Sequence, residues 1–214
     1  MAKVKDYDRN VFINCAFDAN FLNIFRAIVY VVHDCGFIIR CALETGNKDG
    51  VRIDKIIKII EQCRYGIHDL SCLEITKESP LPRFNMPYEL GIFMGCKHYG
   101  DAHHKKKDFL VLDSQPHRYK RVISDLAGYD FPSHNNDPMA AIASVRDWFS
   151  ESTSKVLPGA VYYQERYRNF MNVFPDLCAS MKADINTLNF RDYYALVSVW
   201  IQTQNGQILQ DEIN

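Results

Sequence analysis

The chain has 214 residues, which is enough for one domain with a buried core and an appendage but too few for two full-sized domains. Hydrophobic residues make up 47% and charged residues 24% of the sequence, and this composition excludes long disordered stretches. Lys and Arg number 25 against 26 Asp and Glu, so the formal net charge is −1. A charge this close to zero gives no general electrostatic attraction to nucleic acid or to an anionic membrane.

The cysteines and the first residues indicate where the protein resides. Seven cysteines are scattered without a Cys-x-x-Cys pair, which favours reduced thiols over a disulfide framework or a zinc site. Residues 1–8 lack the apolar run of a signal peptide, and no segment approaches the length of a membrane span. We therefore expect a soluble cytoplasmic protein without a metal or a resident cofactor.

The first seventy residues alternate β-rich runs with apolar residues at helical spacing. In chain order the pattern predicts a strand, a helix, a strand, a helix and a strand, at 11–15, 21–32, 37–43, 53–63 and 65–70. A polar segment bounded by glycines, 46–50, separates the second strand from the second helix.

The next part of the chain begins with an irregular segment, 71–84, which contains two prolines. A helix is predicted from Asn85 to Gly95 or Gly100, and 109–113 is the clearest strand in the sequence. Beyond it we expect a helix, a brief edge strand and a helix, at 119–126, 129–131 and 138–149.

This alternation predicts an α/β fold of the flavodoxin-like kind, a parallel sheet with helices on both faces. We expect an α/β domain over 1–150 and a small helical C-terminal extension over 151–214, with the boundary within 150–159. The extension is rich in aromatic residues. Most of them are expected to pack on the α/β domain, with a self-association surface as the alternative.

In an open parallel sheet, ligands bind outside the carboxyl ends of the strands. The candidate junctions between a strand and the following helix are 14–18, 43–49, 68–71, 85–89 and 113–117. Polar groups at the first of these include Asn14 and Asp18, whereas Arg40 in the second strand is expected to be a paired structural charge.

The junction at 85–91 carries the most specific pattern. Asn85 is a favoured N-cap residue, and Pro87 falls in the first helical turn, where its missing N–H costs nothing. A capping box would place the acid at Tyr88, so routine capping does not explain Glu89. Glu89 shares a helix face with apolar residues, which predicts a half-buried carboxyl with a raised pKa. The alternative is that Glu89 only interacts favourably with the positive N-terminal end of the helix.

Two further polar features have structural alternatives. Asp69, at the end of the third strand, offers a carboxylate for ligand hydroxyls or serves as a cap for the next loop. The basic cluster 103–107 predicts a solvated loop before a strand, with an anion contact as the alternative. No Gly-x-Gly-x-x-Gly, Walker loop, Gly-x-Ser-x-Gly elbow or metal-ligand spacing occurs.

Two motifs together carry a family resemblance. The run 59–71, which ends in Asp69-Leu70-Ser71, and the run Asn85-Met86-Pro87-Tyr88-Glu89-Leu90-Gly91 resemble the TIR-like and nucleoside 2-deoxyribosyltransferase-like superfamily. The resemblance covers roughly residues 10–130. It implies that Glu89 is the catalytic carboxylate at a ribosyl carbon. The substrate-binding residues that the resemblance and the junctions suggest are Asp69, Ser71, Asn85, Tyr88, Asn14 and Asp18.

The resemblance also implies an activity, cleavage of the N-glycosidic bond of a nucleotide. NAD would then be a substrate rather than a cofactor. Such TIR-like enzymes include bacterial immune effectors that act as oligomers, so a homo-oligomer and a protein partner in a defence system are expected. Deoxyribosyltransferases carry a second Asp shortly before the nucleophile, and 81–87 has none. This departure favours TIR-like cleavage, or a nucleotide sensor without turnover, over nucleoside exchange. A scaffold whose helical C-terminus mediates assembly is a further alternative.

Overall fold

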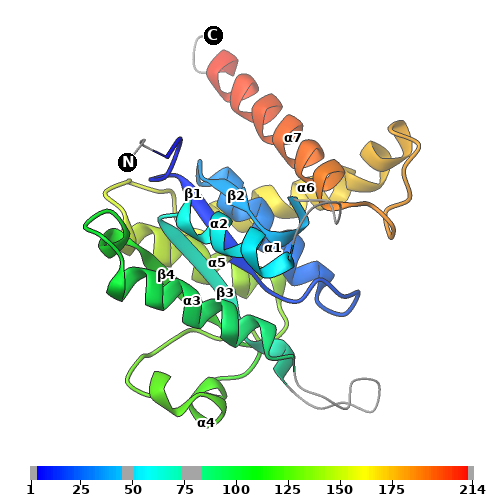
Figure 1. Ribbon diagram of the computed structural model, residues 1–214. Helices are drawn as coiled ribbons and strands as arrows, with labels where there is room; N and C mark the ends of the chain where they lie inside the picture. Colours follow the sequence, from blue (N-terminus) through cyan, green and yellow to red (C-terminus); the bar gives the residue numbers. More distant parts are fainter. Residues whose placement is uncertain (1–3, 45–50, 74–82, 212–214) are drawn as a thin grey trace.

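Four short and mostly buried strands form the sheet. The computed structural model describes residues 4–44, 51–73 and 83–211, and Figure 1 shows its strands side by side. The strands are β1 (Asn10–Asn14), β2 (Ile38–Arg40), β3 (Tyr65–Asp69) and β4 (Asp108–Leu112). Every pair is parallel and the order is β2-β1-β3-β4, which confirms the predicted α/β class.

Helices cover both faces of the sheet, as predicted. Alternation along β1 turns Val11 and Ile13 toward a core that includes α1 (Leu22–Asp34) and α5 (Pro138–Ser152). Phe12 faces a second core, built with α2 (Arg52–Glu61) and α3 (Asn85–Tyr99). In Figure 1, α2 and α3 lie in front of the sheet and α5 behind it.

The C-terminal region consists of α6 (Ala160–Ser180) and α7 (Phe190–Asp211), and the end of α7 extends away from the sheet (Figure 1). Both helices add aromatic residues to the core around α1, which confirms that most of these residues pack on the α/β domain. Arg166 of α6 also donates two hydrogen bonds of 2.8 Å to the carboxylate of Asp34 on α1.

The second strand is shorter than predicted because a side chain turns the chain. The carboxylate of Glu44 accepts hydrogen bonds from the Cys41 backbone N–H at 2.7 Å and from Arg40 Nε at 2.8 Å. These bonds stabilise the short helix η1 (Ala42–Glu44) directly after β2. Arg40 also donates to Gln62, so it is the paired structural charge that the sequence predicts.

The predicted edge strand at 129–131 is wrong. The hydroxyl of Tyr119 donates to the Tyr129 carbonyl and accepts from the Phe131 N–H, so these backbone groups bind a side chain instead of β4. Only a single parallel bridge, between Asp113 and Ser133, continues the sheet here. The predicted helix at 119–126 is divided at its midpoint into α4 (Tyr119–Val122) and η4 (Ser124–Leu126).

Two local expectations also fail. Asn85 is the first residue of α3 and Phe84 is its N-cap, without a side-chain capping bond.

In the basic cluster, Lys105 and Lys106 are exposed, but Lys107 is buried. Its ammonium donates to the carbonyl of Ile60, at 2.6 Å, in the last turn of α2 and to that of Cys63, two residues beyond this helix, where carbonyls lack the partners of a helix interior.

Residues 45–50, which include part of the predicted junction 43–49, and residues 74–82 of the irregular segment 71–84 lie outside the described residues. The other short elements are η2 (Ser71–Leu73) and η3 (His104–Lys106). Within the described ranges, no helix combines the length and apolarity needed to span a membrane.

Candidate functional site

A pocket of about 160 Å³ lies at the carboxyl end of β1, where the ligand site of a parallel sheet is expected. Its walls come from the end of β1, the first residue of α2 and the start of α3. The polar and aromatic side chains that line it are Asn14, Phe17, Arg52, Arg83, Asn85 and Glu89.

Asn14 fixes the start of α3 against the sheet. Its buried amide nitrogen Nδ2 lies 2.8 Å from the Met86 carbonyl and 3.0 Å from Nδ1 of His68 on β3. The first bond ties the end of β1 to the backbone of the first turn of α3, and the second ties β1 to β3. One amide therefore sets the position of the helix that carries Glu89.

Glu89 is the buried carboxyl group of the pocket. Its residue is 4% exposed, and its carboxylate Oε1 lies 3.6 Å from Nη2 of Arg52, a residue whose own side chain is exposed. Burial raises the pKa of Glu89 to about 7, and the positive charge of Arg52 opposes this rise. Near neutral pH this carboxyl is therefore divided between its acid and carboxylate forms, as the sequence predicts for an acid on an apolar helix face.

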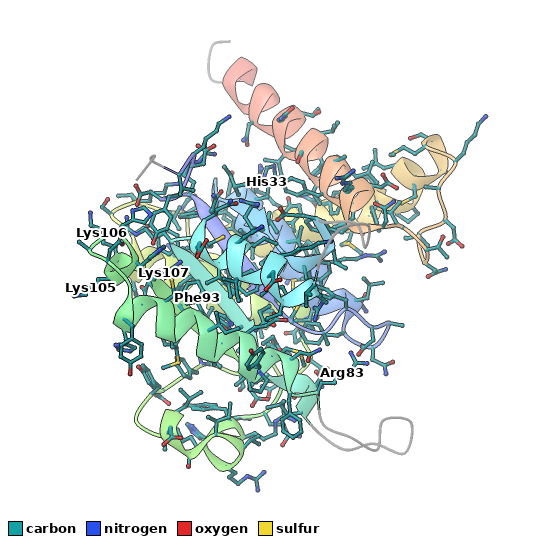
Figure 2. All side chains as sticks on the ribbon, in the orientation of Figure 1. His33, Arg83, Phe93, Lys105, Lys106 and Lys107 are labelled. Carbon is teal, nitrogen blue, oxygen red and sulfur yellow. The ribbon has the colours of Figure 1, made fainter. Side chains whose placement is uncertain are left out.

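A second ion pair closes the other side of the pocket. Arg83, labelled in Figure 2 near the start of α3, lies 2.9 Å from the Asp18 carboxylate. The other oxygen of Asp18 accepts a hydrogen bond from the Phe21 N–H and so stabilises the turn before α1. Asp18 is thus close to the pocket, but it holds Arg83 and the chain instead of facing the cavity.

Asp69 and Ser71 lie elsewhere, in a separate buried cluster. The Asp69 carboxylate accepts a hydrogen bond of 2.8 Å from the Ser71 N–H and faces Nε2 of His134 at 2.9 Å. The Ser71 hydroxyl lies 3.1 Å from the same nitrogen, and Nδ1 of His134 accepts from the Asn136 N–H. Because Ser71 and Asp69 share one ring nitrogen, this set is not a Ser-His-Asp catalytic triad.

His134 follows the bridge residue Ser133 and is fully buried, and no pattern in the sequence marks it as a site residue. The sequence predicts an edge strand at 129–131, whereas the sheet continues at Ser133, so the position of His134 beside the sheet is not predicted. Arg52 and Arg83, which line the pocket, are also absent from the residues predicted from the sequence. Arg52 is the first residue of α2 and Arg83 lies two residues before α3, so a search for basic residues at the starts of these helices would find them.

His68 is another buried residue beside the pocket. Burial is the main cause that lowers its pKa to about 3, so the imidazole is neutral. Gly66, two residues earlier on the same face of β3, leaves the room for this ring, since a Cβ there would lie 2.7 Å from His68 Nε2. The neutral ring positions Asn14 and carries no charge into the pocket.

The remaining predicted residues differ in their exposure. Asn85 lines the pocket. Tyr88 is 61% exposed and is not among the described residues of the lining, and Phe84 is 66% exposed beside it. The two rings stand one helical turn apart at the start of α3, on its solvent side.

The described residues contain no group of three or more His, Cys, Asp or Glu side chains that could hold a metal ion. All seven cysteines are free thiols. Comparisons of the chain with protein-family models, with curated proteins and with solved structures find no match.

Proposed function

We propose that this protein cleaves the N-glycosidic bond of a nucleotide, with NAD as the substrate. The observation that carries the proposal is the buried Glu89 carboxyl in a pocket at the carboxyl end of β1, between Arg52 and Arg83. The resemblance of residues 85–91 to the TIR-like superfamily supports the same choice.

The chemistry requires a negative group beneath the sugar. When the bond between the ribosyl carbon and the base breaks, the electron pair leaves with the base and the ribosyl group gains oxocarbenium character. The Glu89 carboxylate stabilises this positive charge or captures it. Water then supplies the hydroxyl group of the ribosyl product and releases a proton, so NAD and water give nicotinamide, ADP-ribose and H⁺.

Two arginines fit the phosphates of such a substrate. Arg52 and Arg83 are both largely exposed, and each is held at the pocket by a carboxylate, that of Glu89 or of Asp18. Guanidinium groups bind phosphate oxygens in pairs of hydrogen bonds. A diphosphate that replaces the partly exposed pair of Arg83 and Asp18 loses little, because surface pairs contribute about 0–1 kcal/mol.

A nucleotide sensor without turnover is the second candidate, and the position of Asp69 favours it. The resemblance implies that Asp69 holds the sugar, but its two oxygens face Ser71 and His134. With Asp69 engaged in this way, the pocket binds a nucleotide through its arginines, and Glu89 alone contacts the ribose.

Chromatography of the released base separates the two candidates. Purified protein, at low and high concentration because assembly is expected to activate such enzymes, is incubated with NAD and with a panel of nucleosides and nucleotides. The proposal expects nicotinamide from NAD. Release from nucleosides alone would indicate a nucleosidase or transferase, and measurable binding of NAD without release would indicate the sensor.

The variant Glu89→Gln tests the residue assigned to the chemistry. It keeps the size of the side chain and removes the charge, so the release of base is expected to be lost while the fold remains. Glu165→Gln is the matched control, because Glu165 is an exposed residue of α6 outside the pocket. Full activity of a folded Glu89→Gln protein would remove Glu89 from the mechanism.

A further inference from the structure

A second cavity, of about 560 Å³, lies between the α/β domain and the C-terminal helices. Its walls come from the loop after β1, the start of α1, the helix η1 and the start of α7. Phe17 lines both this cavity and the pocket of Glu89, so the two are neighbours. Its volume falls in the range of small-molecule sites, roughly 300–1,000 Å³.

Most of the wall is apolar, with several aromatic rings. Phe25 packs its ring against Phe17 edge to face, with ring centroids 5.2 Å apart, and Phe190 lies 6.0 Å from Phe25. Leu43 and Leu188 complete the apolar surface. A wall of this kind favours a flat, apolar ligand that contacts the ring faces and edges.

One residue of the cavity lining is a buried cation, Arg26. The residue is 6% exposed, and Nη2 donates to the Ile185 carbonyl at 2.6 Å. The guanidinium carbon lies 5.1 Å from the centre of the Phe174 ring and 5.5 Å from that of Tyr193. None of the carboxylates in the described ranges forms an ion pair with it. A buried charge without a counter-ion is costly, so an anion in the cavity would stabilise it.

The other charged groups of the lining leave the cavity positive. The carboxylate of Glu44 faces Arg40 at 2.8 Å and accepts from the Cys41 N–H, so its charge is already balanced. Arg191 is exposed and adds a second positive charge.

The two remaining polar side chains of the wall, those of Asn189 and Tyr193, are already bonded. The Tyr193 hydroxyl donates to the Arg26 carbonyl at 2.9 Å. Asn189 accepts a hydrogen bond from the Asp192 N–H and donates one to the Asp192 carboxylate. The guanidinium of Arg26 is therefore the polar group of the wall that most needs an anionic partner.

We infer that this cavity binds a small organic anion, a carboxylate with an aromatic body. The carboxylate pairs with Arg26, and the aromatic body lies among Phe17, Phe25 and Phe190. This site is separate from the proposed NAD pocket and does not depend on it, because it uses neither Glu89 nor the arginines beside it.

Calorimetric titration with three probes tests the inference. The probes are 2-naphthoate, the uncharged 2-naphthamide and acetate, an anion without the aromatic body. We expect 2-naphthoate to bind one site. We expect 2-naphthamide to bind at least about tenfold more weakly, because it lacks the charge that pairs with Arg26. Acetate is expected to give no measurable binding. Absence of 2-naphthoate binding, or equal affinity for both naphthalene probes, would overturn the inference.

Variants locate the site. Leu43→Trp fills the cavity from a partly exposed position and is expected to abolish 2-naphthoate binding, as is Arg26→Met. Arg168→Met, at an exposed position on α6, is the control and should bind as the wild type does. If Arg26→Met does not fold, the Leu43→Trp variant and the two naphthalene probes still decide whether the anion binds in this cavity. Unchanged binding to Leu43→Trp would place 2-naphthoate elsewhere and refute the site.

Discussion

Replacing Glu89 by Gln should change how the stability of the protein depends on pH. Burial raises the pKa of this carboxyl from 4.5 to about 7, and one pKa unit corresponds to about 1.4 kcal/mol. Ionising Glu89 in the folded protein therefore costs about 3 kcal/mol more than in the unfolded chain. Glutamine is neutral at every pH and removes this cost.

The sign follows from which state binds more protons. Between pH 4.5 and about 7 the folded protein holds the proton of Glu89 and the unfolded chain does not, so stability falls as the pH rises. Above about pH 7 the full penalty is present. The difference in unfolding free energy between Glu89→Gln and wild type should thus grow by about 3 kcal/mol from pH 4 to pH 8.

Urea unfolding of both proteins at several pH values measures this difference. Subtracting one curve from the other cancels the contributions of other groups whose protonation changes on unfolding in this pH range, such as His33 and His68, whose pKa values burial lowers. The Glu165→Gln protein should follow the wild type throughout. If the Glu89→Gln and wild-type curves stay parallel from pH 4 to pH 8, Glu89 is not a buried carboxyl with a raised pKa.

Three other substitutions test the packing by urea unfolding. Gly66→Ala should destabilise the protein by about 1–3 kcal/mol, because the new Cβ would lie 2.7 Å from His68 Nε2. Gly91→Ala should stabilise the protein by about 0.5–1 kcal/mol, since the residue is helical and nothing lies within 4 Å of the new Cβ. Equal effects of the two glycine substitutions on stability would contradict the close packing around β3. Arg166→Lys should lower the free energy of unfolding by about 1–3 kcal/mol, because a lysine keeps only one of the two hydrogen bonds to Asp34. An unchanged midpoint of urea unfolding would show that this pair does not hold α6 on the domain.

The elements of the α/β domain could be predicted because their apolar residues follow the period of the element. The strands at β1, β3 and β4 and the helices α1, α2, α3 and α5 all lie where the sequence places them, with bounds shifted by a few residues. The errors occur where a side chain, instead of the backbone, satisfies a hydrogen-bonding group. The hydroxyl of Tyr119 replaces an edge strand, and the carboxylate of Glu44 ends β2.

The site was predictable in part for the same reason. Glu89 departs from the capping pattern on an apolar helix face, and this departure is visible in the sequence. The bond between Asp69 and His134 is not visible in the sequence, because His134 is 65 residues away, in the segment between η4 and α5. The roles of Asn14, Asn85 and Tyr88 toward a substrate stay predictions. Buried Lys107 was missed because its partners are the end carbonyls of α2, which no local pattern reveals.

The rate of nicotinamide release from NAD as a function of pH tests the central claim most directly. The carboxylate form of Glu89 stabilises the ribosyl cation, so the rate of the wild type should rise with pH through about 7, and Glu89→Gln should release no nicotinamide at any pH. Release that does not depend on pH in this range, or a folded Glu89→Gln protein with the rate of the wild type, would contradict the assignment of Glu89 to this chemistry.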